Sequence, residues 1–143
     1  MEFFVEGRSN SAKWARILLP RMIEGLNIER SRRHVQIIFD KIENNSAEES
    51  HGICMDFTEM NDTYLIVLRP NRSLNAIGLN LAHEMIHVKQ MATGTLKYAP
   101  NNNMLWRGVE YGDDVPYLDR PWEIQAFSGQ ELLYRRAVEA VVS

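Results

Sequence analysis

Three residues within LAHEMIHVKQ, residues 81–90, have types and a spacing that could carry out hydrolysis. If this run is helical, with about 100° per residue, His83 and His87 lie about 40° apart on one face, a single turn from each other. Two imidazoles in that relation can each bring one nitrogen to about 2 Å from a shared zinc ion. Glu84, about 100° around the helix from His83, cannot join them at the metal but can reach a metal-bound water. The pattern therefore indicates two metal ligands and a general base, with two unrelated surface histidines as the alternative.

A catalytic zinc ion usually has three protein ligands and one open position, so a third ligand must come from elsewhere in the chain. No histidine follows His87, and the only cysteine, Cys54, lies in an expected strand. Where a metzincin has glycine and a third histidine, this chain has Gln90 and Thr93. Among the later carboxylates, Glu123 is expected in the first turn of the last helix, which holds a side chain more firmly than a loop does. An acid at this position can also complement the helix dipole without binding metal, and that alternative stays open.

The spacing of apolar residues predicts three helices that must position these side chains. The first covers residues 11–26 and contains Pro20, where a kink or an early end is expected. The second carries the histidines and can begin after Ser73 as N-cap and end at Gly94. The third runs from residue 121 to about residue 142, with proline at its first position.

Alternating apolar residues predict strands before the histidine helix. HVQIIFD reads as one strand, and ICMDFTEMNDTYLIVLRP reads as two strands joined through Asn61 and Asp62. A small, mostly antiparallel sheet is expected, with Tyr64 to Leu68 as an edge on which an extended peptide could lie. The side of the second helix opposite the histidines should pack on this sheet, since it carries an apolar stripe of Leu74, Ile77, Leu81, Met85, Val88 and Ala92.

Two polar or turn-rich segments connect these elements. Residues 43–52 predict a polar loop, and residues 95–120 form a long connection of a kind that is usually functional or hides a short hairpin. Tyr117 and Tyr111 in this connection are candidates to donate a hydrogen bond to the oxyanion of a tetrahedral intermediate, although packing is the commoner role of tyrosine. Gln90 lies on the histidine face, where it can orient a ligand or face solvent.

Composition narrows the class of protein. The chain has 143 residues, of which 45% are hydrophobic and 24% charged, so one globular domain over residues 1–143 is expected. With a net charge of -3, no nucleic acid or anionic membrane is expected as a partner. A single cysteine excludes an internal disulfide and favours a reducing compartment. No signal peptide or membrane-spanning run is evident, so a cytoplasmic protein is predicted.

Two of the motifs resemble those of a known family. HEMIH, followed after 35 residues by EIQA, resembles the arrangement in gluzincin metallopeptidases, where a second helix supplies a glutamate from a Glu-x-x-Ala-type motif. Within residues 64–127, HEMIHVKQ, LWRG and PYLDRPWEIQAF are also similar to small bacteriophage proteins that are often labelled SprT-like. This chain has no histidine after His87 and no cysteine-rich zinc ribbon, so the resemblance extends only to the gluzincin site. This resemblance implies a zincin-like domain in which His83, His87 and Glu123 bind zinc and Glu84 activates water.

The residues and the resemblance together predict an α+β domain that hydrolyses peptide bonds, with Zn²⁺ as cofactor and a peptide or protein as substrate. An unidentified protein partner could set its specificity. One rival is a non-catalytic binding or scaffold protein that keeps zinc to hold two helices together, and another is a zinc hydrolase of a non-peptide amide. The presence of Glu84 favours an enzyme, because a purely structural zinc site needs no base beside it.

Overall fold

The computed structural model describes residues 1–41 and 52–142 and has an α+β architecture, as the sequence predicts. The polar loop expected at residues 43–52 lies outside the described residues, except for Gly52, which begins a strand. Within the described part of the chain, none of the helices is long and apolar enough to cross a membrane.

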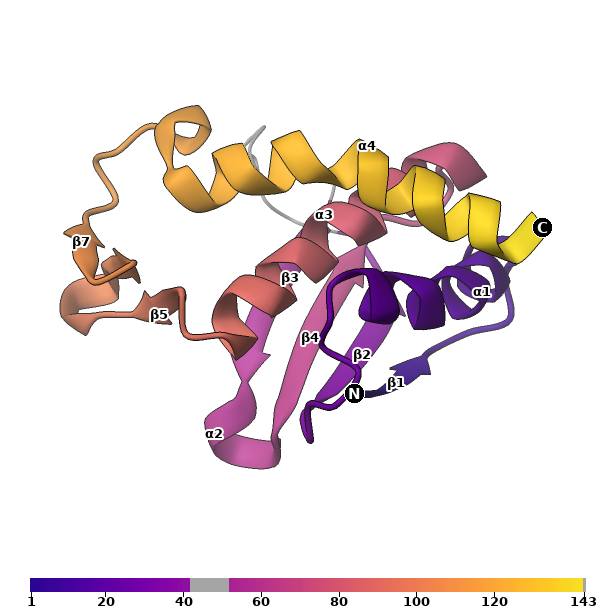
Figure 1. The fold of residues 1–143 in the computed structure, drawn as a ribbon, viewed down its shortest axis with the longest axis horizontal. Helices are drawn as coiled ribbons and strands as arrows, with labels where there is room; N and C mark the ends of the chain where they lie inside the picture. The colour runs from indigo at the N-terminus through magenta and orange to yellow at the C-terminus, as the bar shows by residue number, and fades with distance from the viewer. Residues whose placement is uncertain (42–51, 143) are drawn as a thin grey trace.

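A four-stranded sheet lies beneath the long helices (Figure 1), in the order β1-β2-β4-β3. Its strands are β1 (Glu2–Val5), β2 (His34–Phe39), β3 (Gly52–Phe57) and β4 (Thr63–Leu68). β1 pairs with β2 and β2 with β4 in parallel, and only β3 and β4 pair in antiparallel fashion. The prediction of a mostly antiparallel sheet is therefore wrong for this sheet. The reason lies in β1, which sequence reasoning missed: a helix returns the chain from β1 to β2 and makes that pair parallel.

The predicted pair of strands before the histidine helix is confirmed as the antiparallel β3–β4 hairpin. A single helical turn, α2 (Thr58–Asn61), joins the strands, and Asp62 follows it in the left-handed conformation with φ 57°. The expectation that Tyr64 to Leu68 form a sheet edge is wrong, because β4 lies between β2 and β3. The two edges of this sheet are β1 and β3.

Three long helices lie on one side of the sheet, and each begins or ends where the sequence indicates. α1 (Asn10–Gly25) is capped by Ser9, whose hydroxyl accepts from the Ala12 amide, and it continues through the exposed Pro20, so of the two expected effects of this proline, a kink or an early end, the early end does not occur. α3 (Leu74–Ala92) is capped by Ser73 and is followed by Gly94 at φ 77°. α4 (Pro121–Val142) has the predicted bounds.

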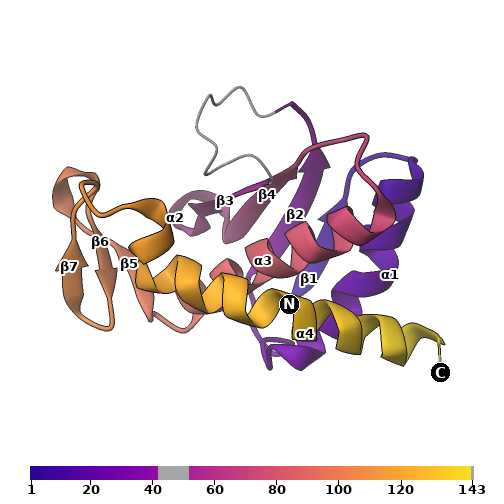
Figure 2. The ribbon, with the colours of Figure 1, turned by 90° about the horizontal axis from the view of Figure 1, so that it is seen from above.

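The long helices form two layers over the sheet. α3 and α1 pack side by side, and α4 crosses over both of them on the side away from the strands (Figure 2). From the apolar stripe, Ile77, Leu81, Met85 and Val88 are fully buried in one core cluster with sheet residues, whereas Leu74 at the start of α3 is 45% exposed. α3 is therefore covered by the sheet on one side and by α4 on the other.

A glycine lets α3 and α4 approach closely. A Cβ atom at Gly78 would lie 2.0 Å from a ring carbon of Tyr134 on α4, which is far inside van der Waals contact. Only a residue without a side chain fits there. This close approach brings the histidine face of α3 against the N-terminal half of α4.

The long connection at residues 95–120 contains a second, fully antiparallel sheet, which includes the hairpin that its length suggests. Its strands are β5 (Leu96–Tyr98), β6 (Met104–Trp106) and β7 (Val109–Tyr111), with the short helical turns η2 (Pro100–Asn102) and η3 (Tyr117–Asp119) in the same region. Arg107 and Gly108 turn the β6–β7 hairpin with φ 50° and 84°. Leu96 and Trp106 bury against Trp122 in the first turn of α4. The small sheet thus fixes the start of α4.

Candidate metal centre

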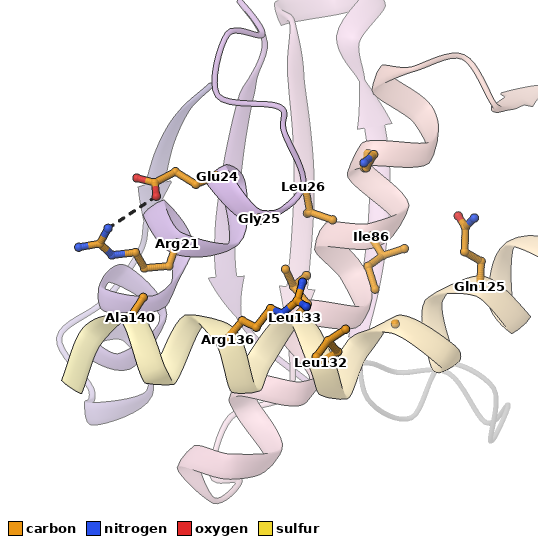
Figure 3. Close-up of a pocket in the computed structure, with 12 residues that line it drawn as sticks. Arg21, Glu24, Gly25, Leu26, Ile86, Gln125, Leu132, Leu133, Arg136 and Ala140 are labelled. Atoms are coloured by element: carbon orange, nitrogen blue, oxygen red, sulfur yellow. Dashed lines mark ion pairs between the residues drawn. The ribbon is translucent and has the colours of Figure 1, made fainter. Parts of the chain in front are cut away.

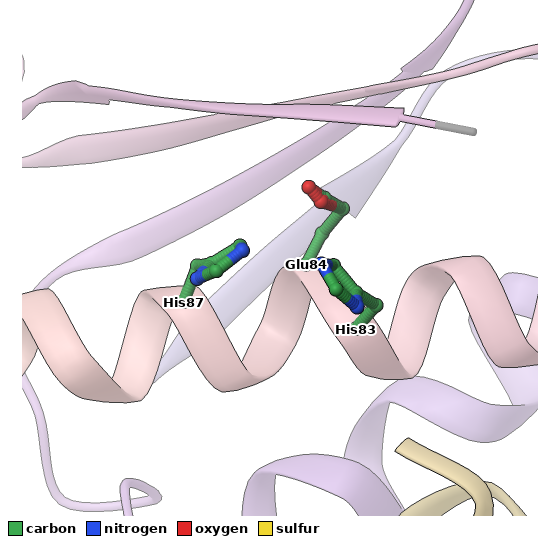
Figure 4. A group of neighbouring side chains, drawn as sticks. All are labelled: His83, Glu84 and His87. Atoms are coloured by element: carbon green, nitrogen blue, oxygen red, sulfur yellow. The ribbon is translucent and has the colours of Figure 1, made fainter. Parts of the chain in front are cut away.

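The two histidines of α3 project from one face of the helix and are buried. His83 is 8% exposed and His87 is 7% exposed, and their ring centroids are 4.9 Å apart (Figure 4). Both rings face α4, since His83 contacts the Phe127 ring at a centroid distance of 4.5 Å. The pair is therefore not a solvent-exposed coincidence of spacing.

Glu123 on α4 reaches both rings at once. Its Oε1 atom lies 2.9 Å from His83 Nε2 and 3.0 Å from His87 Nε2, and its side chain is buried with them. The close packing of α3 on α4, and the burial of Trp122 beside the small sheet, place the first turn of α4 at this point. The structure thus brings together the three residues that the sequence suggests as ligands, although Glu123 lies on another helix, 40 residues after His83 and 36 after His87.

Two glutamines hold the opposite edges of the imidazole rings. His83 Nδ1 lies 2.8 Å from Gln130 Oε1, and His87 Nδ1 lies 2.8 Å from Gln90 Oε1. Gln90 cannot be turned around, because its amide nitrogen donates to the Trp122 carbonyl at 3.0 Å. An amide oxygen only accepts hydrogen bonds, so each Nδ1 is the donor and carries the proton of the neutral ring.

Three acceptors therefore meet at one point. In the neutral rings the Nε2 atoms of His83 and His87 present lone pairs, and Oε1 of Glu123 faces both of them at hydrogen-bond distance. Such a cluster needs a cation among its members, either a proton or a metal ion. Ligand atoms about 2.0–2.1 Å from a tetrahedral zinc ion are separated by about 3.3 Å, a few tenths of an ångström more than the separations observed. Small outward shifts of these three side chains would accommodate the ion.

In the metal-free protein, protons serve as the cation. Burial lowers the pKa of His87, but the hydrogen bond with Glu123 and the negative charge of Glu84 outweigh burial and raise the pKa to about 9. Burial raises the pKa of Glu123, yet its hydrogen-bond contacts with His83 and His87 outweigh burial and lower the pKa to about 2. The site thus holds an imidazolium and a carboxylate when no metal is bound.

Glu84 lies beside the ligand pair but on the side of α3 nearer the strands. Its carboxylate extends toward the sheet in Figure 4 and is buried, with 5% exposure. Its ligand atom and those of His83 and His87 lie within 4.8 Å of one another, so these three residues also form a possible metal-binding group. We favour Glu123 as the third ligand, because its oxygen contacts both Nε2 atoms directly. Glu84 then remains close enough to act on a bound water.

The edge strand β3 comes unusually close to Glu84. A Cβ atom at Gly52 would lie 3.2 Å from Glu84 Cγ and 3.0 Å from a methyl carbon of Leu68. Two residues after Gly52, burial raises the pKa of the Cys54 thiol, and the negative charges of Glu84 and Asp56 raise it further, which keeps this thiol protonated. Cys54 is not part of the metal-binding group among the described residues.

One of the two candidate tyrosines lies at the site. Tyr117 lines a cavity of about 310 Å³ together with His83 and Glu84, and its ring meets the Phe127 ring edge-on at 6.0 Å. Tyr111 instead packs edge-on against Trp122 at 5.8 Å and does not line this cavity. The structure thus places Tyr117, and not Tyr111, in the cavity that His83 and Glu84 line.

Gln130 is the site residue that sequence reasoning missed. It follows Glu123 by seven residues, which returns to the same face of a helix within about 20°. That spacing could have identified it once Glu123 was taken as a ligand. Gln90, for which solvent exposure was the alternative, is buried with 2% exposure and bonded to His87.

A larger groove of about 540 Å³ lies on a different face of α4, between α1, α3 and α4 (Figure 3). Its lining includes Arg21, Glu24 and Arg136 but none of the predicted site residues.

No family model, curated protein or solved structure matches this chain. Function must therefore be argued from the geometry around His83 and His87.

Proposed function

We propose that the protein is a zinc-dependent peptidase of gluzincin type. The observation that carries the proposal is the meeting of His83 Nε2, His87 Nε2 and Glu123 Oε1 at 2.9–3.0 Å, with both Nδ1 atoms already bonded to glutamines. Two neutral imidazoles and a carboxylate are the ligand set that zinc accepts in catalytic sites with three protein ligands. The resemblance of HEMIH and EIQA to gluzincin motifs supports the same assignment.

Each residue has a separate task in the proposed reaction. When bound, zinc would lower the pKa of a coordinated water and polarise the substrate carbonyl. The Glu84 carboxylate takes a proton from the attacking water and returns it to the nitrogen of the leaving amine. Tyr117 donates a hydrogen bond from its hydroxyl to the oxygen that becomes negatively charged. Gln90 and Gln130 keep the imidazole rings in the tautomer that leaves Nε2 free for the metal.

An extended substrate has one sheet edge near this site. β3 is an edge strand of the four-stranded sheet, and its first residue, Gly52, packs against Glu84. A peptide that pairs with β3 by β-augmentation would pass the catalytic residues with its backbone held by strand hydrogen bonds. This assigns to β3 the role that the sequence suggested for β4.

A zinc-stabilised scaffold is the second candidate, because the ligands bridge α3 and α4 and would hold the two helices together. The cavity that His83 and Glu84 line favours the enzyme, since a structural zinc site needs neither a base nor an adjacent space. A zinc hydrolase of a non-peptide amide would use the same residues. It differs from a peptidase only in which substrate it cleaves, so tests on peptide and non-peptide amides distinguish the two.

The decisive experiment compares parent and Glu84→Gln after zinc loading, with an unfolded casein-like protein and a peptide library as substrates. Glu84→Gln keeps the size of the side chain but removes the base, so it should retain zinc and fold normally while hydrolysis falls by roughly a hundredfold or more. Equal cleavage by the two proteins would overturn the proposed mechanism. Absence of cleavage by the parent, with zinc bound, would favour the scaffold.

A further inference from the structure

The cavity beside the metal centre has a lining that indicates what it binds. We name it the Arg72 cavity: the space of about 310 Å³ that Arg72, Ala76, Leu79, Glu84, Tyr117 and Phe127 line, with His83 at its inner end. Of the described residues that line it, Arg72 is the cation and Glu84 the anion. Because Glu84 is assigned to proton transfer, Arg72 is the charged residue of the lining that remains to contact a substrate group.

Arg72 has no partner within the described part of the chain. It takes part in none of the ion pairs or hydrogen bonds found among the described residues, and it is exposed to solvent. An arginine presents five donors in a planar fork that fits a carboxylate with two parallel bonds. The cavity therefore offers an anion-binding group that nothing in the described structure satisfies.

The walls between Arg72 and His83 are largely apolar. Ala76 and Leu79 on α3 and Phe127 on α4, which is 40% exposed, are the apolar side chains of the lining, and Asn80 and Gln130 are polar residues beside them. An apolar side chain that covers Phe127 removes apolar surface from water, which favours binding. A substrate residue with a large apolar or aromatic side chain suits these walls better than a charged one.

The length of α3 sets the distance between Arg72 and the metal centre at His83. Arg72 comes just before the N-cap of α3, and the nine residues from Leu74 to His83 span about 14 Å. An extended peptide advances about 3.4 Å per residue. After the length of the arginine side chain is allowed for, a carboxylate bonded to Arg72 belongs about two to four residues from the bond at the metal centre.

We propose that the Arg72 cavity selects peptide segments that place an apolar side chain against Phe127 and a carboxylate against Arg72. This inference rests on the proposed function, because it names the substrates of the same site. The carboxylate has two possible sources, the C-terminus of a peptide or an acidic side chain within it. Both present the same group to Arg72.

The test measures binding, so it does not depend on cleavage. Three short peptides share a phenylalanine and differ in charge: the first has a free C-terminal carboxylate, the second an amidated C-terminus with a glutamate after the phenylalanine, and the third an amidated C-terminus with glutamine there. Titrations of zinc-loaded protein, followed by NMR, give the Kd of each. The parent, Arg72→Gln and Arg72→Lys are compared, with Arg135→Gln on the exposed side of α4 as the matched control.

We expect the parent to bind at least one of the two charged peptides about three- to fivefold more tightly than the neutral one, as a partly solvated ion pair allows. Arg72→Gln should remove that preference, Arg72→Lys should keep part of it, and Arg135→Gln should leave it unchanged. The charged peptide that is preferred identifies the source of the carboxylate. The preference should also shrink as salt is added.

Two results would overturn the inference. One is equal binding of all three peptides by the parent. The other is a preference that survives in Arg72→Gln, which would mean that the zinc ion itself holds the carboxylate. The proposed function is tested separately, by the Glu84→Gln comparison. If the protein shows the Arg72-dependent preference but cleaves no substrate, the proposed peptidase activity is wrong, while the inference that the cavity binds such peptides still holds.

Discussion

The Nε2 atom of His87 lies 3.0 Å from Oε1 of Glu123, and both atoms are hydrogen-bond acceptors when the imidazole is neutral. Gln90 fixes that tautomer, because its amide oxygen accepts from Nδ1 on the other edge of the ring. Two acceptors at this distance require a cation between them. The occupant of this position, a proton or a metal ion, therefore determines how stable the protein is and how it responds to pH.

Without metal, the protein should be most stable between about pH 4.5 and 6.5. Folding raises the pKa of His87 from 6.5 to about 9, so this group stabilises the fold fully below pH 6.5 and loses its contribution as the pH rises through 9. Folding lowers the pKa of Glu123 from 4.5 to about 2, so its contribution is present above pH 4.5 and is lost as the pH falls through 2. Urea unfolding of chelator-treated protein at a series of pH values measures both limbs. Constant stability from pH 6.5 to 9 would contradict the assignment of the shared proton.

Zinc should bind with a stoichiometry of one per chain and raise the melting temperature. The ion would bridge α3 and α4, and it requires neutral imidazoles, so binding releases the proton held by His87 and strengthens as the pH rises. Free zinc at about a hundred times its Kd stabilises the folded state by about 2.7 kcal/mol, or about 10 °C for a chain of this size. Elemental analysis and melting curves with and without chelator test this. If the purified protein contains no metal and takes up none on titration, the proposed metal centre is wrong.

Glu123→Ala should weaken zinc binding by more than roughly a hundredfold, since it removes a direct ligand. It also deprives two buried imidazoles of their shared partner, which should cost the metal-free protein about 1–3 kcal/mol. Glu131→Ala, an exposed position on the same helix, is the control and should change neither quantity. Isothermal titration with zinc and urea unfolding give the two values. Should Glu123→Ala bind zinc as the parent does, the ligand set would have to be His83, Glu84 and His87 instead.

The helices that carry the site could be predicted from local signals. Ser73 and Gly94 bound α3 because a hydroxyl caps the first turn and a positive φ ends the last, and Pro121 begins α4 for a similar local reason. The periodicity of α3 also places His83 and His87 on one face. Such features depend on neighbours within one or two turns, so a single sequence shows them.

The pairing of distant segments could not be predicted in the same way. Whether β2 pairs in parallel with β4 depends on where the chain travels between them, and alternation of apolar residues carries no record of that path. The sequence left both Tyr111 and Tyr117 as candidates for the same reason, because their positions depend on how the small sheet packs against Trp122. The approach of Gly52 to Glu84 is also a long-range contact that only the folded chain shows.

The contact between Gly52 and Glu84 makes a last prediction about the catalytic base. In Gly52→Ala the new methyl group would lie 3.2 Å from Glu84 Cγ, 3.0 Å from a methyl carbon of Leu68 and 3.2 Å from the Val67 carbonyl oxygen, so the Glu84 side chain and its surroundings must shift by a few tenths of an ångström. No metal ligand is touched, and zinc content should stay at the parental value. A misplaced base costs rate steeply, and we expect hydrolysis to fall by roughly tenfold or more. Gly129→Ala is the control for adding a methyl group, because its methyl would lie 3.2 Å from a flexible carbon of Ile86 in the groove on the other face of α4 and would not approach Glu84. Parental turnover in Gly52→Ala would show that the position of Glu84 does not depend on β3, and it would weaken the case for this strand as the edge where substrate lies.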